Sequence, residues 1–138
     1  MQTRLELHTD GPGLYEFTPL AQHFVQDQGG GVLTLMVQHT SASLLIQENA
    51  DPEVQSDLQA FFERLVPPSD HPSMAYLRYT YEGPDDMPAH IKATLMPVSL
   101  SIPVTDGRLA LGTWQGLYLV EHRTQPHTRR VALHFART

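Results

Sequence analysis

Short apolar segments separated by turn-forming residues recur along almost the whole chain, and this pattern limits the folds that the chain can adopt. The clearest case is a predicted hairpin, in which residues 98–104 and 108–111 flank Thr105-Asp106-Gly107. Aspartate followed by glycine readily takes the left-handed backbone of a tight hairpin turn. With seven to nine such strands and two or three helices, we expect a mainly β (α+β) fold, an antiparallel two-sheet β-sandwich with short helices at its edges. A ferredoxin-like α+β fold is the alternative.

Other strands are predicted by alternation of apolar and polar residues or by continuous apolar character. Residues 32–37 are almost all apolar, which predicts a strand covered on both faces. The remaining predicted strands are residues 3–8, 43–47, 76–81, 117–120 and 130–135.

Two helices have clear start signals. Thr18-Pro19 and Asp51-Pro52 each predict a helix N-cap followed by proline at the first helical position. The second helix repeats apolar residues at helical spacing, and we interpret its aromatic pair, Phe61 and Phe62, as core packing.

A third, short helix is predicted after Asp86, which can cap it. This helix contains His90 and Lys92 and ends before Pro97. Asp86 and His90 are four residues apart, so both side chains lie on one face of the helix, where a carboxylate and an imidazole can pair.

The amino-acid composition limits the kinds of function that the chain can have. The chain has no cysteine, which excludes disulfides and thiolate sites. Residues 1–70 contain two basic and ten acidic side chains (net −8), and residues 71–138 contain seven basic and five acidic ones (net +2). An acidic chain without a basic cluster binds nucleic acid poorly, and no apolar run approaches the ~20 residues of a membrane span. We therefore expect one soluble cytoplasmic domain, residues 1–138, without a nucleic-acid or membrane partner.

Three polar stretches are candidates for one site: residues 39–51, 88–93 and 112–116. The first begins at the end of an apolar strand, passes through small residues and ends at a helix cap. Small side chains allow a ligand to approach backbone donors closely. We expect the three stretches to converge.

The order and spacing of these stretches resemble the YjbQ family, and the resemblance extends over nearly the whole chain. It is carried by His39-Thr40-Ser41-Ala42-Ser43, Glu48-Asn49-Ala50-Asp51-Pro52, residues 81–92, Gly112-Thr113-Trp114-Gln115-Gly116 and Glu121-His122-Arg123. The resemblance implies a β-sandwich subunit that assembles as a homotrimer, with a polar pocket near the subunit boundaries. It also implies a secondary thiamine-phosphate synthase activity, which joins a thiazole phosphate to a pyrimidine diphosphate and releases pyrophosphate.

The resemblance further implies that His39 and His90 bind a metal ion or transfer protons. Family members usually place a third histidine shortly before His90, where this chain has Tyr79. A zinc site needs three or four ligands, and a phenol with a pKa near ~10 is a weak substitute. A divalent ion such as zinc or magnesium therefore needs another ligand, such as His122 or Glu48, or the pocket works without metal. No nucleotide or haem cofactor is indicated.

The other candidate residues have assigned roles in such a pocket. Glu48 is a candidate general base, and Lys92 and Arg130 are candidates for binding a phosphate. Trp114 can stack on a planar ring or anchor packing. The further substrate-binding candidates are Ser41, Ser43, Asn49, Thr113 and Gln115. Two functions follow: an enzyme for a small phosphorylated or heterocyclic substrate, or a non-catalytic trimeric protein that binds a small anion or metal ion.

Overall fold

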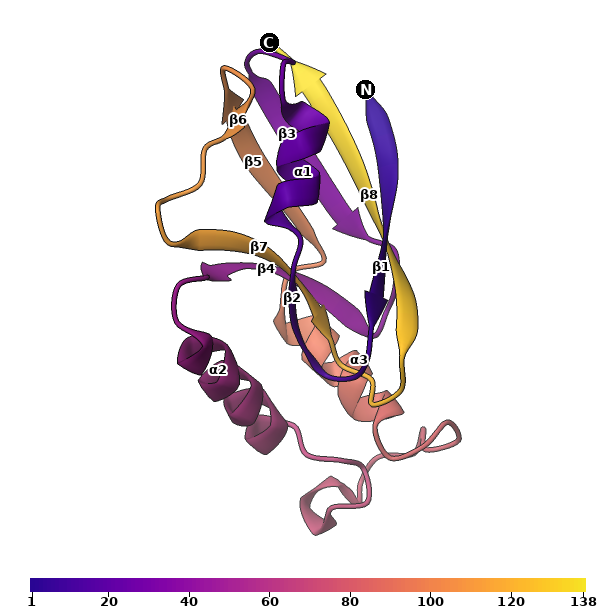
Figure 1. The fold of residues 1–138 in the computed structure, drawn as a ribbon. Helices are drawn as coiled ribbons and strands as arrows, with labels where there is room; N and C mark the ends of the chain where they lie inside the picture. The colour runs from indigo at the N-terminus through magenta and orange to yellow at the C-terminus, as the bar shows by residue number, and fades with distance from the viewer.

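The computed structural model describes all 138 residues as two antiparallel sheets with helices along their edges (Figure 1). The five-stranded sheet has the order β1 (Gln2–Thr9), β8 (His127–Arg137), β3 (Gly31–Val37), β5 (Ser99–Thr105) and β6 (Arg108–Leu109). The three-stranded sheet has the order β2 (Gly13–Glu16), β7 (Gln115–Glu121) and β4 (Ala42–Glu48). The helices are α1 (Thr18–Val25), α2 (Pro52–Leu65) and α3 (Asp86–Leu95), with a 3₁₀ turn η1 (Pro72–Met74). The predicted two-sheet α+β architecture is confirmed.

The hydrophobic core lies between the two sheets. Leu33 and Leu35 of β3 are paired with Phe135 and Leu133 of β8, and all four are buried. On the facing sheet, Leu44 is paired with Leu119, and both belong to the same core. Burial of apolar side chains between the sheets is the main stabilising contribution of such an arrangement.

The outer face of β3 corrects one sequence-based expectation. Its residues alternate between buried and exposed, and the outward-facing Val32 and Met36 are 38% and 52% exposed. The strand is therefore covered on one face only within the chain. The nearly continuous apolar run suggested two covered faces because two of the three outward positions, Val32 and Met36, are also apolar.

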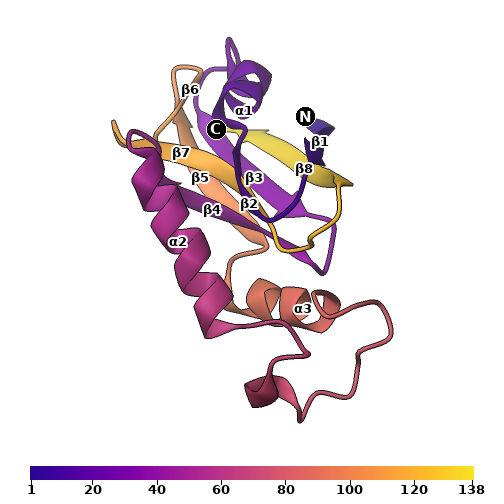
Figure 2. The same ribbon diagram turned by 60° about the horizontal axis from the view of Figure 1, so that its bottom comes forward.

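The segment 76–81 corrects another expectation, because it forms no strand. It belongs to the long connection between α2 and α3, which lies away from both sheets in Figures 1 and 2. Aromatic residues favour strands mainly because they pack on a pleated sheet surface, and no sheet edge lies beside this segment. The sequence also failed to predict β2, whose four residues pair with β7.

The two N-terminal caps differ. The Asp51 carboxylate accepts a hydrogen bond from the Glu53 amide at 2.9 Å, so the predicted cap of α2 is confirmed. For α1, Phe17 occupies the cap position and Thr18 lies inside the helix. The Thr18 hydroxyl accepts instead from the Leu117 amide at 2.8 Å and thereby connects α1 to β7.

The aromatic pair of α2 is not core packing. Phe61 is 57% exposed and no residue of the helix is fully buried. The helix crosses the edge of the three-stranded sheet (Figure 2), where Gln55 Nε2 donates to the Tyr118 hydroxyl at 2.9 Å. No helix of the chain is both long and apolar enough to cross a bilayer.

Candidate functional site

The three polar stretches that the sequence suggested as one site lie at two ends of β4, which is itself part of the first stretch. At one end of the strand Ala42 is paired with Glu121, and at the other end Glu48 is paired with Gln115. Seven residues of strand span about 20 Å. The stretch 112–116 therefore lies at the far end of β4 from His39, and the three stretches do not converge within one chain.

A cavity of about 930 Å³ opens beside the Ala42 end of β4. It brings together His39 and Ser41 of the first stretch and His90 of the second. Its other polar walls are Gln38, Thr40, Thr94 and Arg129, and its apolar walls are Met36, Val37, Ala93 and Val98. We refer to it as the His39 cavity. A mainly apolar hollow with a few convergent polar groups is typical of a small-molecule site.

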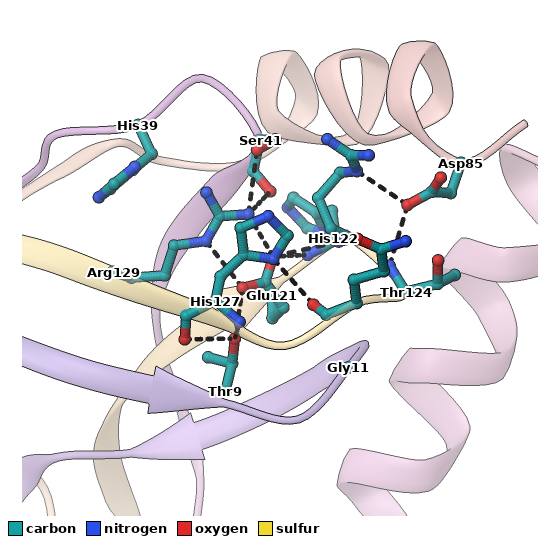
Figure 3. A network of polar contacts seen from close by, with 12 residues as sticks. Thr9, Gly11, His39, Ser41, Asp85, Glu121, His122, Thr124, His127 and Arg129 are labelled. Atoms are coloured by element: carbon teal, nitrogen blue, oxygen red, sulfur yellow. Dashed lines mark hydrogen bonds and ion pairs between the residues drawn. The ribbon is translucent and has the colours of Figure 1, made fainter. Parts of the chain in front are cut away.

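Arg129 is fixed in the wall of this cavity by a buried ion pair with Glu121. Its Nε donates to Glu121 Oε1 at 2.7 Å, and its Nη2 donates to Glu121 Oε2 and to Ser41 Oγ, the latter at 3.0 Å (Figure 3). Nη1 has no protein acceptor and points to the side on which His39 lies (Figure 3). The guanidinium thus keeps donor capacity for a ligand.

Glu121 holds Arg129 in this orientation because its own carboxylate is fully buried and well satisfied. Besides Arg129, it accepts from the Thr9 hydroxyl at 2.6 Å and from the amides of His122 and Arg123 at 3.0 and 3.1 Å. Burial alone would raise the pKa of Glu121, but the hydrogen bonds from Arg129, Thr9 and the Arg123 amide outweigh it and lower the pKa. Both partners are therefore charged near neutral pH.

His39 is arranged as a hydrogen-bond donor. Its Nε2 accepts from the Arg130 amide at 2.8 Å, so in the neutral ring the proton resides on Nδ1. Burial, followed by the positive charge of Arg129, lowers the pKa of His39. The neutral imidazole thus offers an N–H group and no free lone pair.

His90 connects α3 to the turn before β4. Its Nδ1 lies 3.1 Å from the Thr40 carbonyl oxygen and its Nε2 lies 3.4 Å from Asp86 Oδ2. The Thr40 carbonyl can only accept, so Nδ1 donates to it, and the predicted pairing of Asp86 with His90 is confirmed as a close contact. Asp86 is the first residue of α3 and Asp85 occupies the cap position. The other oxygen of Asp86 accepts from Arg123 Nη1 at 2.9 Å.

As placed, these side chains do not fit a metal ion. Nε2 of His39 and Nδ1 of His90 already have hydrogen-bond partners, and Nε2 of His90 faces Asp86 Oδ2 at 3.4 Å. The exposed Tyr79 lies with its ring centre 6.2 Å from that of His90, and its hydroxyl donates to Glu82. No group of three or more His, Cys, Asp or Glu side chains with metal-ligand geometry is present. A metal bound by His39 Nε2 or His90 Nδ1 would have to replace an existing hydrogen bond.

Four predicted site residues lie outside the His39 cavity although they are close to it in sequence. Ser43 and His122 share the opposite face of the three-stranded sheet, where Ser43 Oγ lies 2.9 Å from His122 Nε2. Lys92 lines a different hollow, together with His122. Burial, followed by the charge of Lys92, lowers the pKa of His122 to about 4. Arg130 is exposed and lies 3.8 Å from Glu6.

The remaining predicted residues form a turn at the Glu48 end of β4. The Glu48 carboxylate accepts from the Ala50 and Asp51 amides, both at 3.0 Å. The Gln115 side-chain oxygen accepts from the Gly112 amide at 2.7 Å. Asn49 Nδ2 donates to the Gln115 carbonyl, and Thr113 and Trp114 are exposed. These polar groups mainly satisfy one another.

Arg129 and Glu121 were not among the predicted site residues, although the sequence carries a signal for Arg129. In β8, Arg129 has the same parity as the buried Val131 and Leu133. An arginine on the inward face of an alternating strand indicates a buried charge that needs a partner. Glu121 is the fitting partner, but its pairing across strands follows only from the fold.

Comparison with known proteins agrees with this architecture. The sequence profile described as "UPF0047 protein YjbQ-like" matches residues 3–138. The chain belongs to the YjbQ family. It is 49% identical to the UPF0047 protein sll1880 of Synechocystis sp. over 135 residues, covering 96% of this chain and 89% of that protein. It is 48% identical to the UPF0047 protein YjbQ of Escherichia coli O157:H7, covering 73% of this chain and 70% of that protein.

Solved structures of proteins with similar sequences share this fold. The conserved hypothetical protein TT1486 of Thermus thermophilus superimposes with a TM-score of 0.85 at 33% identity, covering 97% of this chain and 99% of that one. A yjbq/upf0047 family protein of Clostridium acetobutylicum gives a TM-score of 0.79 at 30% identity, with 99% of both chains covered. The two-sheet arrangement is therefore the family fold.

Proposed function

We propose that this YjbQ-family chain is a small-molecule enzyme that binds a phosphorylated or heterocyclic substrate in the His39 cavity. The observation that carries the proposal is the unpaired Nη1 of Arg129, held at the cavity wall by Glu121. A fixed guanidinium and an imidazole N–H suit phosphate oxygens, because both are preorganised donors. Apolar walls beside them suit a ring.

Thiamine-phosphate synthesis is the reaction that we propose to test first. In it, the bond between the pyrimidine methylene carbon and the diphosphate oxygen breaks and its electrons leave with pyrophosphate. The thiazole nitrogen then forms a bond to that carbon, and no protein base has to remove a proton. A site in which His39 offers a donor and no free lone pair is compatible with such chemistry. Arg129 and His39 would stabilise the departing charge, and His90 would position the Thr40 turn.

Turnover by purified protein tests this proposal. We expect pyrophosphate release from the two substrates to fall at least tenfold in His39→Ala and in His90→Ala. His23→Ala, which removes an exposed histidine of α1 outside the cavity, serves as the matched control. If both cavity variants keep the wild-type rate, the reaction does not occur in this cavity. Binding of pyrophosphate without turnover would favour the alternative, a non-catalytic protein for a small anion.

A metal-bound form is a separate proposal with its own measurement. Elemental analysis of freshly purified protein decides it. Stoichiometric zinc or magnesium that is lost in His39→Ala would mean that the hydrogen bonds of His39 and His90 rearrange around an ion. Protein without a stoichiometric metal that still turns over substrate would exclude that form.

We also propose a homotrimer. The outward apolar residues of β3, Val32 and Met36, remain exposed in one chain, and a second copy would cover them. Native mass spectrometry is expected to give three chains per particle. Val32→Glu together with Met36→Glu should shift the mass to that of a single chain, and an unchanged mass would place the interface elsewhere.

A further inference from the structure

β1 forms an open edge of the five-stranded sheet, because it pairs with β8 on one side and with no strand on the other (Figure 1). It is eight residues long and contains neither proline nor glycine. The opposite edge strand, β6, has only two residues. Proteins usually keep edge strands short or interrupted, because a long free edge can pair with another chain. β1 is the longest edge strand of the molecule and lacks such an interruption.

The free side of β1 carries backbone groups without partners. Met1 and Phe135 exchange both backbone hydrogen bonds, at 3.1 and 2.8 Å. Hydrogen-bonded pairs alternate along an antiparallel ladder, so the odd-numbered residues of β1 bond to β8. The even-numbered residues direct their N–H and C=O groups away from β8, where no group of the chain bonds them. These residues are Gln2, Arg4, Glu6 and His8.

The side chains along this edge are complementary to those of a second copy. Free backbone groups must face free backbone groups, so even-numbered residues lie opposite even-numbered residues when two β1 strands pair antiparallel. Pairing centred on Leu5 places Arg4 of each copy opposite Glu6 of the other. A slip of two residues places Arg4 opposite Arg4, or Glu6 opposite Glu6. Opposite charges stabilise a cross-strand pair and like charges destabilise it, so one register is favoured.

Both faces of β1 fit this register. On the outer face, Glu6 lies 3.8 Å from Arg130, its neighbour on β8, and Arg4 of the second copy gives it a cation on the other side. On the inner face, Leu5 and Leu7 are half-buried and pack against the core. A second strand covers the flanks that these leucines expose at the edge.

We propose that β1 pairs antiparallel with β1 of a second copy, centred on Leu5, so that two five-stranded sheets join across a two-fold axis. This contact is independent of the proposed reaction. It also leaves the outward residues of β3 free for the proposed trimer, because β8 lies between β1 and β3. Two paired strands bury less than the ~1,200 Å² at which stable interfaces usually begin. We therefore expect a transient contact that dissociates in dilute protein.

A single cysteine tests the register. The chain has no cysteine, so Leu5→Cys introduces its only thiol, and oxidised glutathione then traps even a short-lived contact as a disulfide-linked dimer. In the proposed register, residue 5 faces its own copy as a non-hydrogen-bonded pair with Cα atoms about 4.5 Å apart, within the range of a disulfide. Leu7→Cys is the matched control, because residue 7 faces Thr3 of the second copy. We expect dimer to form roughly tenfold faster in Leu5→Cys than in Leu7→Cys. Equal rates would overturn the proposal.

Charge reversals in the Leu5→Cys background test the cross-strand pairs. Arg4→Glu places like charges opposite each other at both pairs and should slow dimer formation roughly tenfold. Adding Glu6→Arg makes both pairs complementary again and should restore the rate. Arg108→Glu reverses an exposed arginine of β6 at the opposite edge and should leave the rate unchanged. Equal slowing by Arg4→Glu and Arg108→Glu would indicate general repulsion between chains and contradict the pairing.

A second pair of variants tests the same register if Leu5→Cys does not fold. Residue 3 of one copy faces residue 7 of the other, again as a non-hydrogen-bonded pair. A mixture of Thr3→Cys and Leu7→Cys should therefore form the mixed dimer faster than either variant forms its own dimer. A mixture without this preference would reject the register.

Discussion

The two ends of β4 are similarly polar in sequence but differ in the structure. At the Ala42 end, Arg129 and His39 keep N–H groups without protein acceptors, and these groups border a cavity of about 930 Å³. At the opposite end, the side chains of Glu48 and Gln115 accept hydrogen bonds from nearby backbone amides and close a turn.

This difference shows why polarity alone does not locate a binding site. Buried polar groups in folded proteins are nearly always paired, so a set of side chains that pair among themselves needs no ligand. A fixed donor left open beside a hollow is available to a ligand in place of water. On this criterion the Ala42 end is the candidate site, and the Glu48 end stabilises the connection to α2.

The largest expected effect comes from removing Arg129. Arg129→Leu leaves the Glu121 carboxylate buried without its charged partner, and loss of one member of a buried pair costs about 3–5 kcal/mol. We expect the free energy of unfolding, measured with chemical denaturant, to fall by that amount. Arg130→Leu removes the exposed neighbouring arginine and should change stability by less than about 1 kcal/mol.

A double variant tests whether the loss of stability comes from the unpaired charge of Glu121. Arg129→Leu combined with Glu121→Leu removes both charges, and apolar replacement of a complete buried pair is often neutral. We expect the double variant to regain a large part of the lost stability. Pyrophosphate binding, which Arg129→Leu should abolish, is expected to remain absent. Equal losses in Arg129→Leu and Arg130→Leu would contradict the assignment of Arg129 as a buried, paired group.

The second prediction concerns acid, which should destabilise the Ala42 end. The pKa of His122 is about 4 in the folded chain, against 6.5 for a free histidine, so the unfolded chain binds the extra proton as pH falls from 6.5 to 4. Stability present above pH 6.5 is therefore lost in that window, by about 3 kcal/mol. Below it, Glu121, whose pKa is also lowered, adds a further loss.

Denaturation between pH 4 and 7 measures this effect. His122→Asn should flatten the profile between pH 6.5 and 4, whereas His23→Asn, at an exposed position of α1, should leave the wild-type slope. Hydrogen exchange should show that amides near Ala42 lose protection before those near Glu48. Simultaneous loss at both ends would mean that the two ends unfold as one unit.

Features that depend on neighbouring residues could be predicted from the sequence, whereas contacts between residues far apart in the chain could not. The Asp51 cap and the pairing of Asp86 with His90 depend on residues two to four positions apart. The pairing of Arg129 with Glu121 depends on how β7 and β8 face each other across the core. The sequence suggested one site for His90 and Lys92, but two residues along a helix turn by about 200°, so the two side chains enter different hollows.

The third prediction tests the turn at the other end of β4. Glu48→Ala removes the acceptor for the Ala50 and Asp51 amides, and loss of a capping side chain costs about 1 kcal/mol. We expect that decrease in the free energy of unfolding, with pyrophosphate affinity changed by less than a factor of three. Asp57→Ala, at an exposed position of α2, is the matched control. A tenfold loss of affinity in Glu48→Ala would mean that both ends contribute to binding.

The smallest expected effect uses Trp114, the only tryptophan of the chain, as a probe of the Glu48 end. Its side chain is 63% exposed and lies near the far end of β4 from the His39 cavity, so pyrophosphate that binds in the cavity of the same chain should leave its fluorescence almost unchanged. Binding itself is followed by calorimetry in the same samples. Quenching that saturates at the calorimetric Kd would show that Trp114 from another copy reaches the cavity. In that case the two ends, separate within one chain, would form one site between subunits.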